Sequence, residues 1–318
     1  MIDTLNFSYE YKDGCMTTKE EMVKNLEKVT KIYYPNGASS FSAKFKDYKI
    51  SVGDSRLKLT GSITKQVFGN NFQTLSRPQL IDGIGELSEH LNFDVSRCKV
   101  HRIDVSTNWK MDHSPPAYFD SLGQDYYGNW TRQPSFTNRA SLYWNINGTK
   151  VSREKLCYDK TVWAKDKGIK IPKEFKDLNL FRYENRLMST NVVSTIIDKL
   201  KPLVKHLFEK DIYILLIKEW KHQWDTIEKI KKLNFKLKPM KESEMQQLII
   251  ARCIDAIGEE EYGNLIQQMK AFKVFKFPSQ YTRFRKNINR IRERNSVIDN
   301  PLLEELEIKI GDVEVYYS

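Results

Sequence analysis

The stretch Arg182-Tyr183-Glu184-Asn185-Arg186-Leu187 alternates large ionisable side chains with other residues. Successive side chains of a β-strand point to opposite faces, so this spacing places Arg182, Glu184 and Arg186 together on one face. Tyr183 then points to the opposite face, which we expect to be the core. The alternation predicts a strand of an antiparallel sheet with one polar face.

Two further stretches have the same spacing. Arg102 and Asp104 share a face in His101-Arg102-Ile103-Asp104-Val105, and Tyr158 and Lys160 share one in Leu156-Cys157-Tyr158-Asp159-Lys160. The three strands together supply a nucleophile, two carboxylates and several cations, which is the inventory of a metal-assisted, DNA-cleaving tyrosine site. Any half-solvated antiparallel strand also alternates in this way, and an R-x-D or R-x-E pair can be a salt-bridge ladder. Both readings remain open on alternation alone.

Composition indicates a globular protein with an anionic partner. The 318 residues are 40% hydrophobic, and 52 Lys and Arg against 41 Asp and Glu give a net charge of +11. A basic chain favours nucleic acid or an acidic membrane surface. The longest apolar run, Ile212 to Ile217, is too short to span a bilayer, and no basic segment followed by an apolar stretch opens the chain. We therefore expect no membrane partner and a cytoplasmic location.

The cysteines and histidines form no recognisable metal-binding pattern. The sequence has no C-x-x-C pair, no H-x-H pair and no H-E-x-x-H pair. A metal ion would therefore be held mainly by oxygen atoms, which suits Mg²⁺ or Mn²⁺.

Short strand-like segments dominate the chain up to about residue 190. They predict an α+β domain built on an antiparallel sheet of the split βαβ kind, with helices over Thr18 to Lys31 and Ser76 to Leu91. The predicted strands are Asp47 to Val52, Leu57 to Ile63, Val100 to Thr107, Ser141 to Ile146, Lys155 to Asp159 and Leu180 to Leu187.

Helical periodicity dominates after residue 190. The predicted helices are Val192 to Phe208, Asp211 to Lys232, Glu242 to Ala256 and Glu259 to Ala271. We therefore predict a domain boundary near residue 190, so that all three candidate strands fall in the first domain.

The most basic segment of the chain lies in this second part. Residues 270–294 hold nine cations and one acid, a local net charge of 9 − 1 = +8. Ser279 can N-cap a helix there, with an apolar stripe on one side and cations on another. The stripe is Tyr281, Phe284, Ile288 and Ile291, and the candidate DNA-binding cations are Arg283, Arg285, Lys286 and Arg290. With the helix before it, this segment resembles a helix-turn-helix, although a charged outer face also serves solubility alone.

Five motifs in a fixed order carry a family resemblance. They are Gly61-Ser62-Ile63-Thr64-Lys65 with Gly69-Asn70-Asn71, then Arg102-Ile103-Asp104, Tyr158-Asp159-Lys160, Arg182 to Leu187, and Tyr281 to Lys286. In this order the chain resembles rolling-circle replication initiators, most closely the gene-two type of filamentous phages, which is similar to plasmid trans-acting initiators. The resemblance implies a catalytic nicking and joining domain over residues 1–190, a helical DNA-binding domain over residues 191–318, and a location in the cytoplasm of a bacterial host. Its implied partners are origin DNA, single-stranded or supercoiled, and the host replication helicase and polymerase, with a possible homodimer.

The resemblance also implies roles for the site residues. Tyr158 would attack the scissile phosphate, leave a 5′-phosphotyrosine and a 3′-hydroxyl primer, and later rejoin the ends, with Lys160 stabilising the phenolate or the phosphate. Asp104 and Glu184 would hold Mg²⁺ or Mn²⁺. The residues expected to contact DNA near the nucleophile are Arg102, Arg182, Arg186, Lys65 and Asn71. Four other tyrosines are rival nucleophiles: Tyr126, Tyr127, Tyr143 and Tyr183.

The chain departs from the family pattern in its metal ligands. The His-hydrophobic-His pair of better-known rolling-circle nucleases is absent, and Thr107 and Asn108 stand where some plasmid relatives carry a second acid. The third ligand is left open between His101, Asn71 and another residue, and His101 points to the opposite face of an ideal strand.

Two other functions are compatible with the same residues. In a non-catalytic origin or operator binder, the three strands are a salt-bridged scaffold and only the basic helix matters. A relaxase-like nickase of a mobile element would share the chemistry and differ in its biological context.

Overall fold

The computed structural model describes residues 1–11, 17–126, 130–134, 140–146, 152–230, 241–295 and 300–313. Contacts divide the chain into two compact units, one made of residues 1–230 and 305–318 and the other of residues 231–304. No helix in the described residues is both long and apolar enough to cross a membrane.

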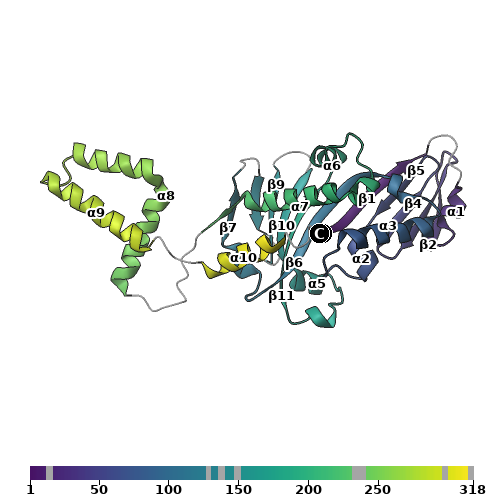
Figure 1. Ribbon diagram of the computed structural model, residues 1–318, viewed down its shortest axis with the longest axis horizontal. Helices are drawn as coiled ribbons and strands as arrows, with labels where there is room; N and C mark the ends of the chain where they lie inside the picture. Colours follow the sequence, from purple (N-terminus) through teal and green to yellow (C-terminus); the bar gives the residue numbers. More distant parts are fainter. Residues whose placement is uncertain are drawn as a thin grey trace. The chain divides into compact units, whose positions relative to one another are not determined.

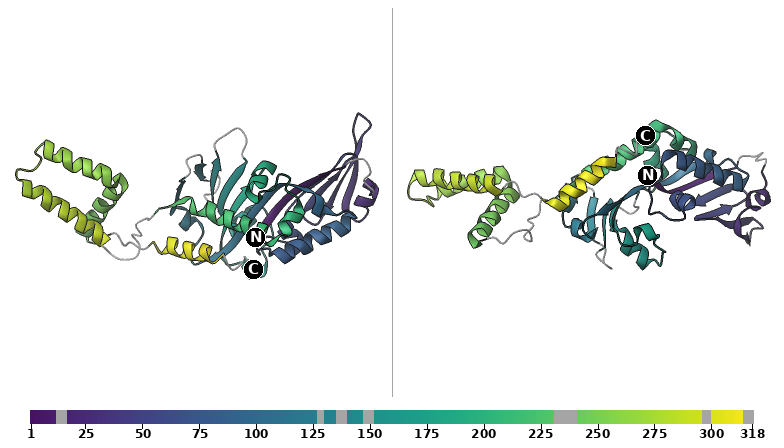
Figure 2. Two further views of the ribbon diagram at one scale, coloured as in Figure 1. Left: turned by 45° about the horizontal axis from the view of Figure 1, so that its top comes forward. Right: turned by 60° about the horizontal axis from the view of Figure 1, so that its bottom comes forward.

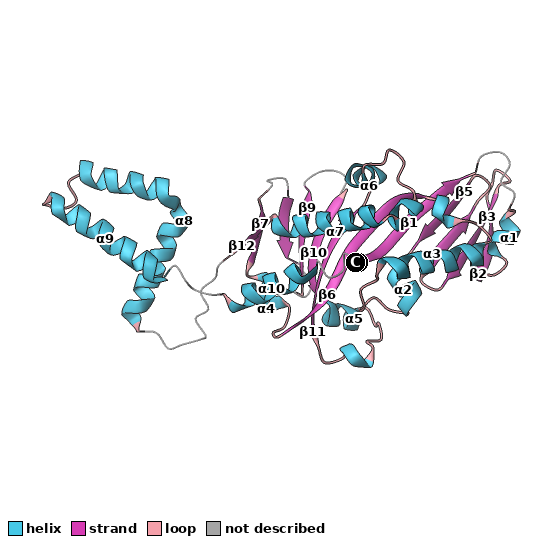
Figure 3. Cartoon of the chain, in the orientation of Figure 1, coloured by secondary structure: helices cyan, strands magenta, loops and turns pink. Residues whose placement is uncertain are grey.

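A ten-stranded antiparallel sheet forms the first unit (Figures 1 and 3). Its strand order is β2-β3-β4-β5-β1-β6-β11-β10-β9-β8, so the N-terminal strand β1 lies inside the sheet beside β6. The strands are β1 (Ile2–Glu10), β2 (Glu27–Tyr33), β3 (Ser39–Phe45), β4 (Tyr48–Val52), β5 (Arg56–Thr60), β6 (Lys99–Met111), β8 (Trp130–Pro134), β9 (Ser141–Ile146), β10 (Arg153–Asp159) and β11 (Asn179–Leu187). A separate two-stranded sheet pairs β7 (Leu122–Asp125) with β12 (Ile227–Lys229).

Helices of the first unit pack on the sheet and connect its strands (Figures 1 and 2). They are α1 (Lys19–Val23), α2 (Ile63–Phe68), α3 (Arg77–Leu91), α4 (Pro116–Phe119), α5 (Lys160–Asp166), α6 (Thr190–Ile197), α7 (Lys210–Asp225) and most of α10 (Pro301–Gly311). Short 3₁₀ turns cover Val95–Arg97, Lys173–Phe175 and Val204–Phe208.

The two faces of the sheet differ in chemistry. On the apolar face, Tyr183 of β11 packs against Trp220 and Trp224 of α7, with ring centroids 5.0 and 5.2 Å apart. On the polar face, which carries Arg182 and Glu184, the ring of Trp163 from α5 contacts Tyr158 at a centroid distance of 5.8 Å. Residues directly opposite each other on antiparallel strands share a face, so the pairing register extends this assignment across the whole sheet.

Two β-bulges interrupt the pairing of β1 with β6. Ile2 pairs with Val105 and Thr4 with Asp104, so Asp3 is an extra residue on β1. Asn6 pairs with Arg102 and Phe7 with Val100, so His101 is an extra residue on β6. A bulge places two residues opposite one partner, and it re-aims a side chain that strict alternation would send to the other face.

The second unit is helical and consists mainly of α8 (Glu242–Ala271) and α9 (Pro278–Asn295). Ile254, Tyr262 and Ile266 of α8 form a small core with Ile288 of α9, against which Phe284 packs. The Tyr281 hydroxyl accepts a hydrogen bond of 2.9 Å from the Phe275 amide and donates one of 3.0 Å to the Met269 carbonyl. These bonds fix the turn between the two helices.

The predicted fold class is confirmed: an antiparallel sheet is followed by a mostly helical region with a helix-turn-helix arrangement. The helix predicted from Thr18 is wrong beyond Val23, because residues 27–33 form the edge strand β2. Leu57 to Ile63 is a strand only as far as Thr60, and the two helices predicted over residues 242–271 are one continuous helix. Helix α9 begins at Pro278, so Ser279 lies inside its first turn and is not an N-cap.

The compact unit extends beyond the boundary that we predicted after residue 190. Helix α6 packs on β6, and α7 packs on β6 and β11, so residues 190–225 complete the apolar core of the sheet. The C-terminal helix returns to the same unit, where Glu307 accepts a hydrogen bond of 3.1 Å from the Trp224 indole. As a division of function, the boundary at 190 stays a prediction.

Candidate active site

Tyr158 and Glu184 meet on the polar face of the sheet. Tyr158 lies directly opposite Arg182 in the pairing of β10 with β11, and Glu184 is two residues further along β11. The Tyr158 hydroxyl donates a hydrogen bond of 2.8 Å to Glu184 Oε1. Tyr158 is only 3% exposed, so its hydroxyl lies in the floor of the polar face. The structure thus brings together the predicted nucleophile and one of the two predicted metal ligands.

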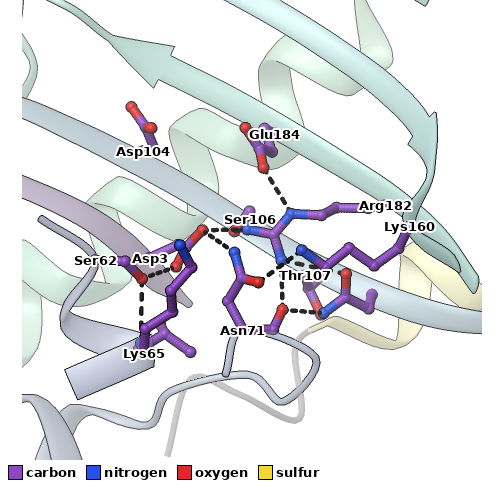
Figure 4. A network of polar contacts seen from close by, with 12 residues as sticks. Asp3, Ser62, Lys65, Asn71, Asp104, Ser106, Thr107, Lys160, Arg182 and Glu184 are labelled. Atoms are coloured by element: carbon purple, nitrogen blue, oxygen red, sulfur yellow. Dashed lines mark hydrogen bonds and ion pairs between the residues drawn. The ribbon is translucent and has the colours of Figure 1, made fainter. Parts of the chain in front are cut away.

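Arg182 is the centre of the hydrogen-bond network around this pair (Figure 4). Its Nε donates to Glu184 Oε1 at 2.6 Å, and one terminal nitrogen donates to the Asn71 carbonyl at 3.1 Å and to Asn108 Oδ1 at 3.2 Å. The other terminal nitrogen donates to Asp3 and, at 2.7 Å, to Ser106 Oγ. These contacts match the five N–H groups of a guanidinium, and Arg182 is 1% exposed. Arg182 is thus enclosed and hydrogen-bonded on both sides of its guanidinium, and its contact with DNA stays a prediction.

Asp3 connects this network to the segment after β5, and sequence reasoning missed it. The bulge on β1 turns Asp3 to the polar face, where its carboxylate forms an ion pair with Arg182. The same carboxylate accepts hydrogen bonds from the Ser62 hydroxyl and, at 3.1 Å, from Asn71 Nδ2. Figure 4 shows Asp3 between Ser62, Asn71 and Arg182.

Lys160 lies beside Tyr158 but begins helix α5. Asp159 ends β10 and caps α5 through hydrogen bonds from the amides of Thr161 and Val162. The Lys160 ammonium donates to Asn71 Oδ1 at 2.6 Å and lies 4.2 Å from the ring centroid of Trp163 and 6.0 Å from that of Tyr158. Burial lowers the pKa of Lys160 to about 7. The predicted proximity of Lys160 to Tyr158 is present in the structure.

Asn71 and Lys65 occupy different positions around the site. Asn71 is buried and uses its side chain for Asp3 and Lys160, so its role is to join these residues. Lys65 is partly exposed in α2, where its Nζ lies 3.4 Å from an oxygen of Asp47. Gly69 ends α2 with a φ of 72°, which fits the turn expected of the Gly69-Asn70-Asn71 motif.

Asp104 and Glu184 are both bound by arginines. Arg102 makes a bidentate contact with Asp104, with two distances of 2.8 Å. Arg186 lies directly opposite Asp104 on the neighbouring strand, and its Nε donates to Glu184 Oε2 at 2.8 Å. Within the described residues, no group of three or more His, Cys, Asp and Glu side chains is arranged to hold a metal ion.

The donor set nevertheless fits a divalent cation in its chemistry. Asp104 and Glu184 offer carboxylate oxygens, the ligands that Mg²⁺ takes. Burial raises the pKa of Asp104 even though Arg102 opposes the shift, so further positive charge would stabilise this carboxylate. Arg102 and Arg186 retain 27% and 24% side-chain exposure and can turn outward, whereas the side chain of Arg182 is enclosed.

The electrostatics of the site keep Tyr158 protonated in this state. Burial raises the pKa of the Tyr158 phenol well above its usual value; the charge of Arg182 opposes this shift, and Glu184 adds to it. Burial alone would raise the pKa of Glu184, but Arg182 and Arg186 outweigh it and hold that pKa well below its usual range. A weakly basic carboxylate thus accepts the hydrogen bond of a very weak acid, and ionisation of Tyr158 requires added positive charge.

His101 lies on the polar face, contrary to our expectation for an ideal strand. The bulge on β6 turns it to the side of Ser8, whose Oγ is 2.6 Å from His101 Nε2. His101 Nδ1 is 2.7 Å from Thr190 Oγ1. These two contacts occupy both ring nitrogens, and neither joins His101 to Asp104 or Glu184.

The rival tyrosines differ in their position relative to Glu184. Tyr183 points to the apolar face, as predicted, and packs between tryptophans of α7. Tyr143 pairs with Leu156, which in turn pairs with Glu184, so Tyr143 lies on the polar face. Its side chain is half-buried. Tyr126 is 68% exposed, and Tyr127 lies outside the described residues.

Helix α9 presents the predicted cations to solvent. Tyr281 and Ile288 are buried against α8, as the apolar stripe predicts. The exposed cations are Arg283, Arg285, Lys286 and Arg290.

A family model for the N-terminal part of the replication-associated gene 2 protein of phages matches residues 1–200. This is most of the chain and includes Tyr158 and both predicted metal ligands. The chain belongs to this family. Membership supports the role of a rolling-circle replication initiator, in agreement with the resemblance seen in the motifs.

Comparison with solved structures gives a similar protein described as a rolling-circle replication initiator from Geobacillus stearothermophilus. The identity is 12% and the TM-score 0.35, over 76% of this chain and 91% of that one. No curated protein matches the chain.

Proposed function

We propose that the chain initiates rolling-circle replication by cutting one strand of origin DNA through Tyr158. The observation that carries the proposal is the hydrogen bond between Tyr158 and Glu184, held on the polar face by Arg182 and Asp3. Buried ionisable groups cost stability unless they are paired, and such clusters concentrate at functional sites.

The reaction is a phosphoryl transfer from DNA to the protein. The Tyr158 oxygen attacks a phosphodiester, a bond forms between that oxygen and phosphorus, and the bond from phosphorus to the 3′-oxygen breaks. The 3′-oxygen takes up a proton, equal to the one that Tyr158 gives up, and becomes the primer end. The 5′-phosphotyrosine preserves a phosphodiester, so the reverse attack by a 3′-hydroxyl rejoins the ends.

Activation of Tyr158 requires that positive charge increases near its hydroxyl. Asp104 and Glu184 would hold Mg²⁺ or Mn²⁺, which polarises the scissile phosphate when bound. Arg102 and Arg186, partly exposed beside these carboxylates, would turn to the phosphates that flank the scissile one. Lys160 would stabilise the phenolate from the side of the ring.

Origin DNA would be recognised partly by the second unit. The exposed cations of α9 suit the phosphate backbone, and a helix that follows a turn can enter the major groove. Duplex or supercoiled origin DNA would bind there, and an unwound strand would be cut at Tyr158. The helicase and polymerase that extend the primer would come from the host.

The test is incubation of the protein with labelled single-stranded and supercoiled DNA and Mg²⁺ or Mn²⁺, followed by denaturing electrophoresis and peptide mass spectrometry. We expect a metal-dependent nucleotide adduct on Tyr158 that is absent from Tyr158→Phe. Tyr143→Phe is the matched control, because it removes a hydroxyl from the same face one strand away, and it should retain the adduct.

An adduct on Tyr143 would keep the reaction and move the nucleophile. Tight binding of origin DNA without any cleavage would favour a non-catalytic origin or operator binder. Cutting at a transfer origin of a mobile element, in place of a replication origin, would indicate a relaxase-like nickase.

A further inference from the structure

Lysine and arginine side chains also occupy the polar face far from Tyr158. Lys58 of β5 lies directly opposite Ser8 and Ser51, and Ser8 lies opposite Lys99 of β6, so these residues share the face of Arg102. Arg56 belongs to it as well, because its terminal nitrogen donates to Ser8 Oγ at 3.0 Å. Lys49, Arg56 and Lys58 are exposed, and Lys99 is half-buried.

The arrangement of these cations opposes stability. Lys44 of β3 and Lys49 of β4 stand directly opposite each other, and like charges in that position destabilise an antiparallel pair. Two acids pair with this group of cations, Glu27 opposite Lys44 and Glu10 opposite Arg56. A solvated sheet face needs only polar side chains of mixed sign. The cations that four strands present on this face instead suit the binding of a polyanion.

The pKa of His101 responds to the positive charge of these cations. Burial lowers the pKa of His101, and Arg56, Lys99 and Lys58 lower it further, against an opposing effect of Glu10. The bulge turns His101 to this face, where its Nε2 lies 3.5 Å from a terminal nitrogen of Arg56. Arg102, which binds Asp104, lies three residues along β6 from Lys99 on the same face.

We propose that Arg56, Lys58 and Lys99, with Lys49 beside them, bind the phosphate backbone of the DNA strand that Tyr158 cuts. This inference rests on the proposed function and adds a second contact to it. Strand β5 lies four strands from β10 in the sheet, about 19 Å at ~4.8 Å per strand. Tyr158 is in register with Asn108 of β6 through Arg182, and Lys99 lies nine residues from Asn108 along β6, about 30 Å at ~3.3 Å per residue. The two offsets together span about 36 Å, which corresponds to about ten nucleotides at the rise of B-form DNA. The sheet would thus hold the DNA strand at two places, with the scissile phosphate at one end of the bound segment.

The test compares a triple variant with a matched control. The variant is Arg56→Gln/Lys58→Gln/Lys99→Gln, and the control is Lys205→Gln/Lys210→Gln/Lys218→Gln, which removes three exposed lysines from the segment around α7. Binding is measured by fluorescence anisotropy against salt concentration. The probes are a short single-stranded oligonucleotide around the nick and two longer ones, extended on the 5′ or the 3′ side. Circular dichroism confirms that each variant folds.

The proposal predicts that the variant binds one of the two longer oligonucleotides about tenfold more weakly than the wild type, with a salt slope shallower by about 2. Binding of the short oligonucleotide should change little, and the control should behave as the wild type. A slope and a length dependence equal to the wild type would overturn the proposal. Absence of cutting by the wild-type protein would overturn the proposed function alone, because the salt slope is measured without cleavage.

Discussion

The Tyr158 hydroxyl donates to Glu184 Oε1 at 2.8 Å across neighbouring strands, while Arg182 and Arg186 bind the same carboxylate. The proposed nucleophile and its acceptor therefore belong to one charge network. Any change at Glu184 alters both the acidity of Tyr158 and the pairing of two arginines. The acidity of Tyr158 also depends on Arg182, which is enclosed.

Replacement of this carboxylate should separate cutting from binding. We expect Glu184→Gln to lower the rate of nicking about 100-fold or more, because the hydroxyl loses an ionised acceptor and the proposed metal loses a ligand. Affinity for single-stranded DNA should change little. Single-turnover nicking and anisotropy measure the two effects.

Glu154→Gln is the control for that variant, since Glu154 pairs with Arg186 on the same face without contact to Tyr158. It should retain nicking within a few-fold of the wild type. An equal loss in both variants would mean that net charge, and not the position of Glu184, controls the rate.

Asp3 should contribute strongly to stability. Its carboxylate pairs with Arg182, which is enclosed, and removal of one member of a buried ion pair leaves the other charge uncompensated. We expect Asp3→Asn to lower the free energy of unfolding by about 3 kcal/mol in urea denaturation. Asp54→Asn, which breaks the exposed pair with Lys19, should unfold at the same urea concentration as the wild type. Equal midpoints for both variants would show that the Asp3 pair is not a stabilising contact.

Alternation predicted the part of the site that lies on regular strands. Arg182, Glu184 and Tyr158 share a face as expected, and Tyr183 points to the core. The same rule failed for His101 because a bulge reverses the phase of β6 locally. It provided no signal for Asp3, because a single acid near the chain start has no visible partner until β1 is placed inside the sheet.

The differences between the predicted and the observed elements have similar physical causes. Strand β2 is exposed along its whole length, so the sequence there carries no burial pattern to distinguish it from an exposed helix. Helical periodicity places α6 and α7 after the predicted boundary, but it does not reveal what a helix packs on. Their apolar sides cover β6 and β11, and only the tertiary structure shows it.

Stability should rise with pH above neutrality because two lysines are buried. Burial lowers the pKa of Lys160 to about 7 and that of Lys155 to about 8, from 10.5 in the unfolded chain. The unfolded state therefore binds more protons between these values, and the free energy of unfolding increases as pH rises through this window. Each group adds up to about 1.4 kcal/mol per pH unit.

Urea unfolding at pH 8 and pH 9 measures this slope. Lys160→Met should reduce it by about 1.4 kcal/mol per pH unit, whereas Lys218→Met, at an exposed position of α7, should leave it unchanged. A slope that survives in Lys160→Met would show that Lys160 keeps its proton in the folded protein.

The cations of α9 should govern affinity for duplex DNA without affecting the chemical step. Arg283, Lys286 and Arg290 are exposed on the helix whose Tyr281 and Ile288 are buried, so their replacement by Gln leaves the packing of α8 with α9 intact. We expect the triple variant to bind duplex DNA more weakly, whether or not it carries the origin sequence. The slope of log affinity against log salt concentration should be shallower by about 2.7, because each phosphate contact contributes about 0.9. Nicking of a short single-stranded oligonucleotide at saturation should equal that of the wild type, since Tyr158 and Glu184 lie in the other unit. The control is again Lys205→Gln/Lys210→Gln/Lys218→Gln, which changes the net charge equally. If the control and the α9 variant lose the same affinity, attraction by overall charge explains binding and α9 is not a DNA contact.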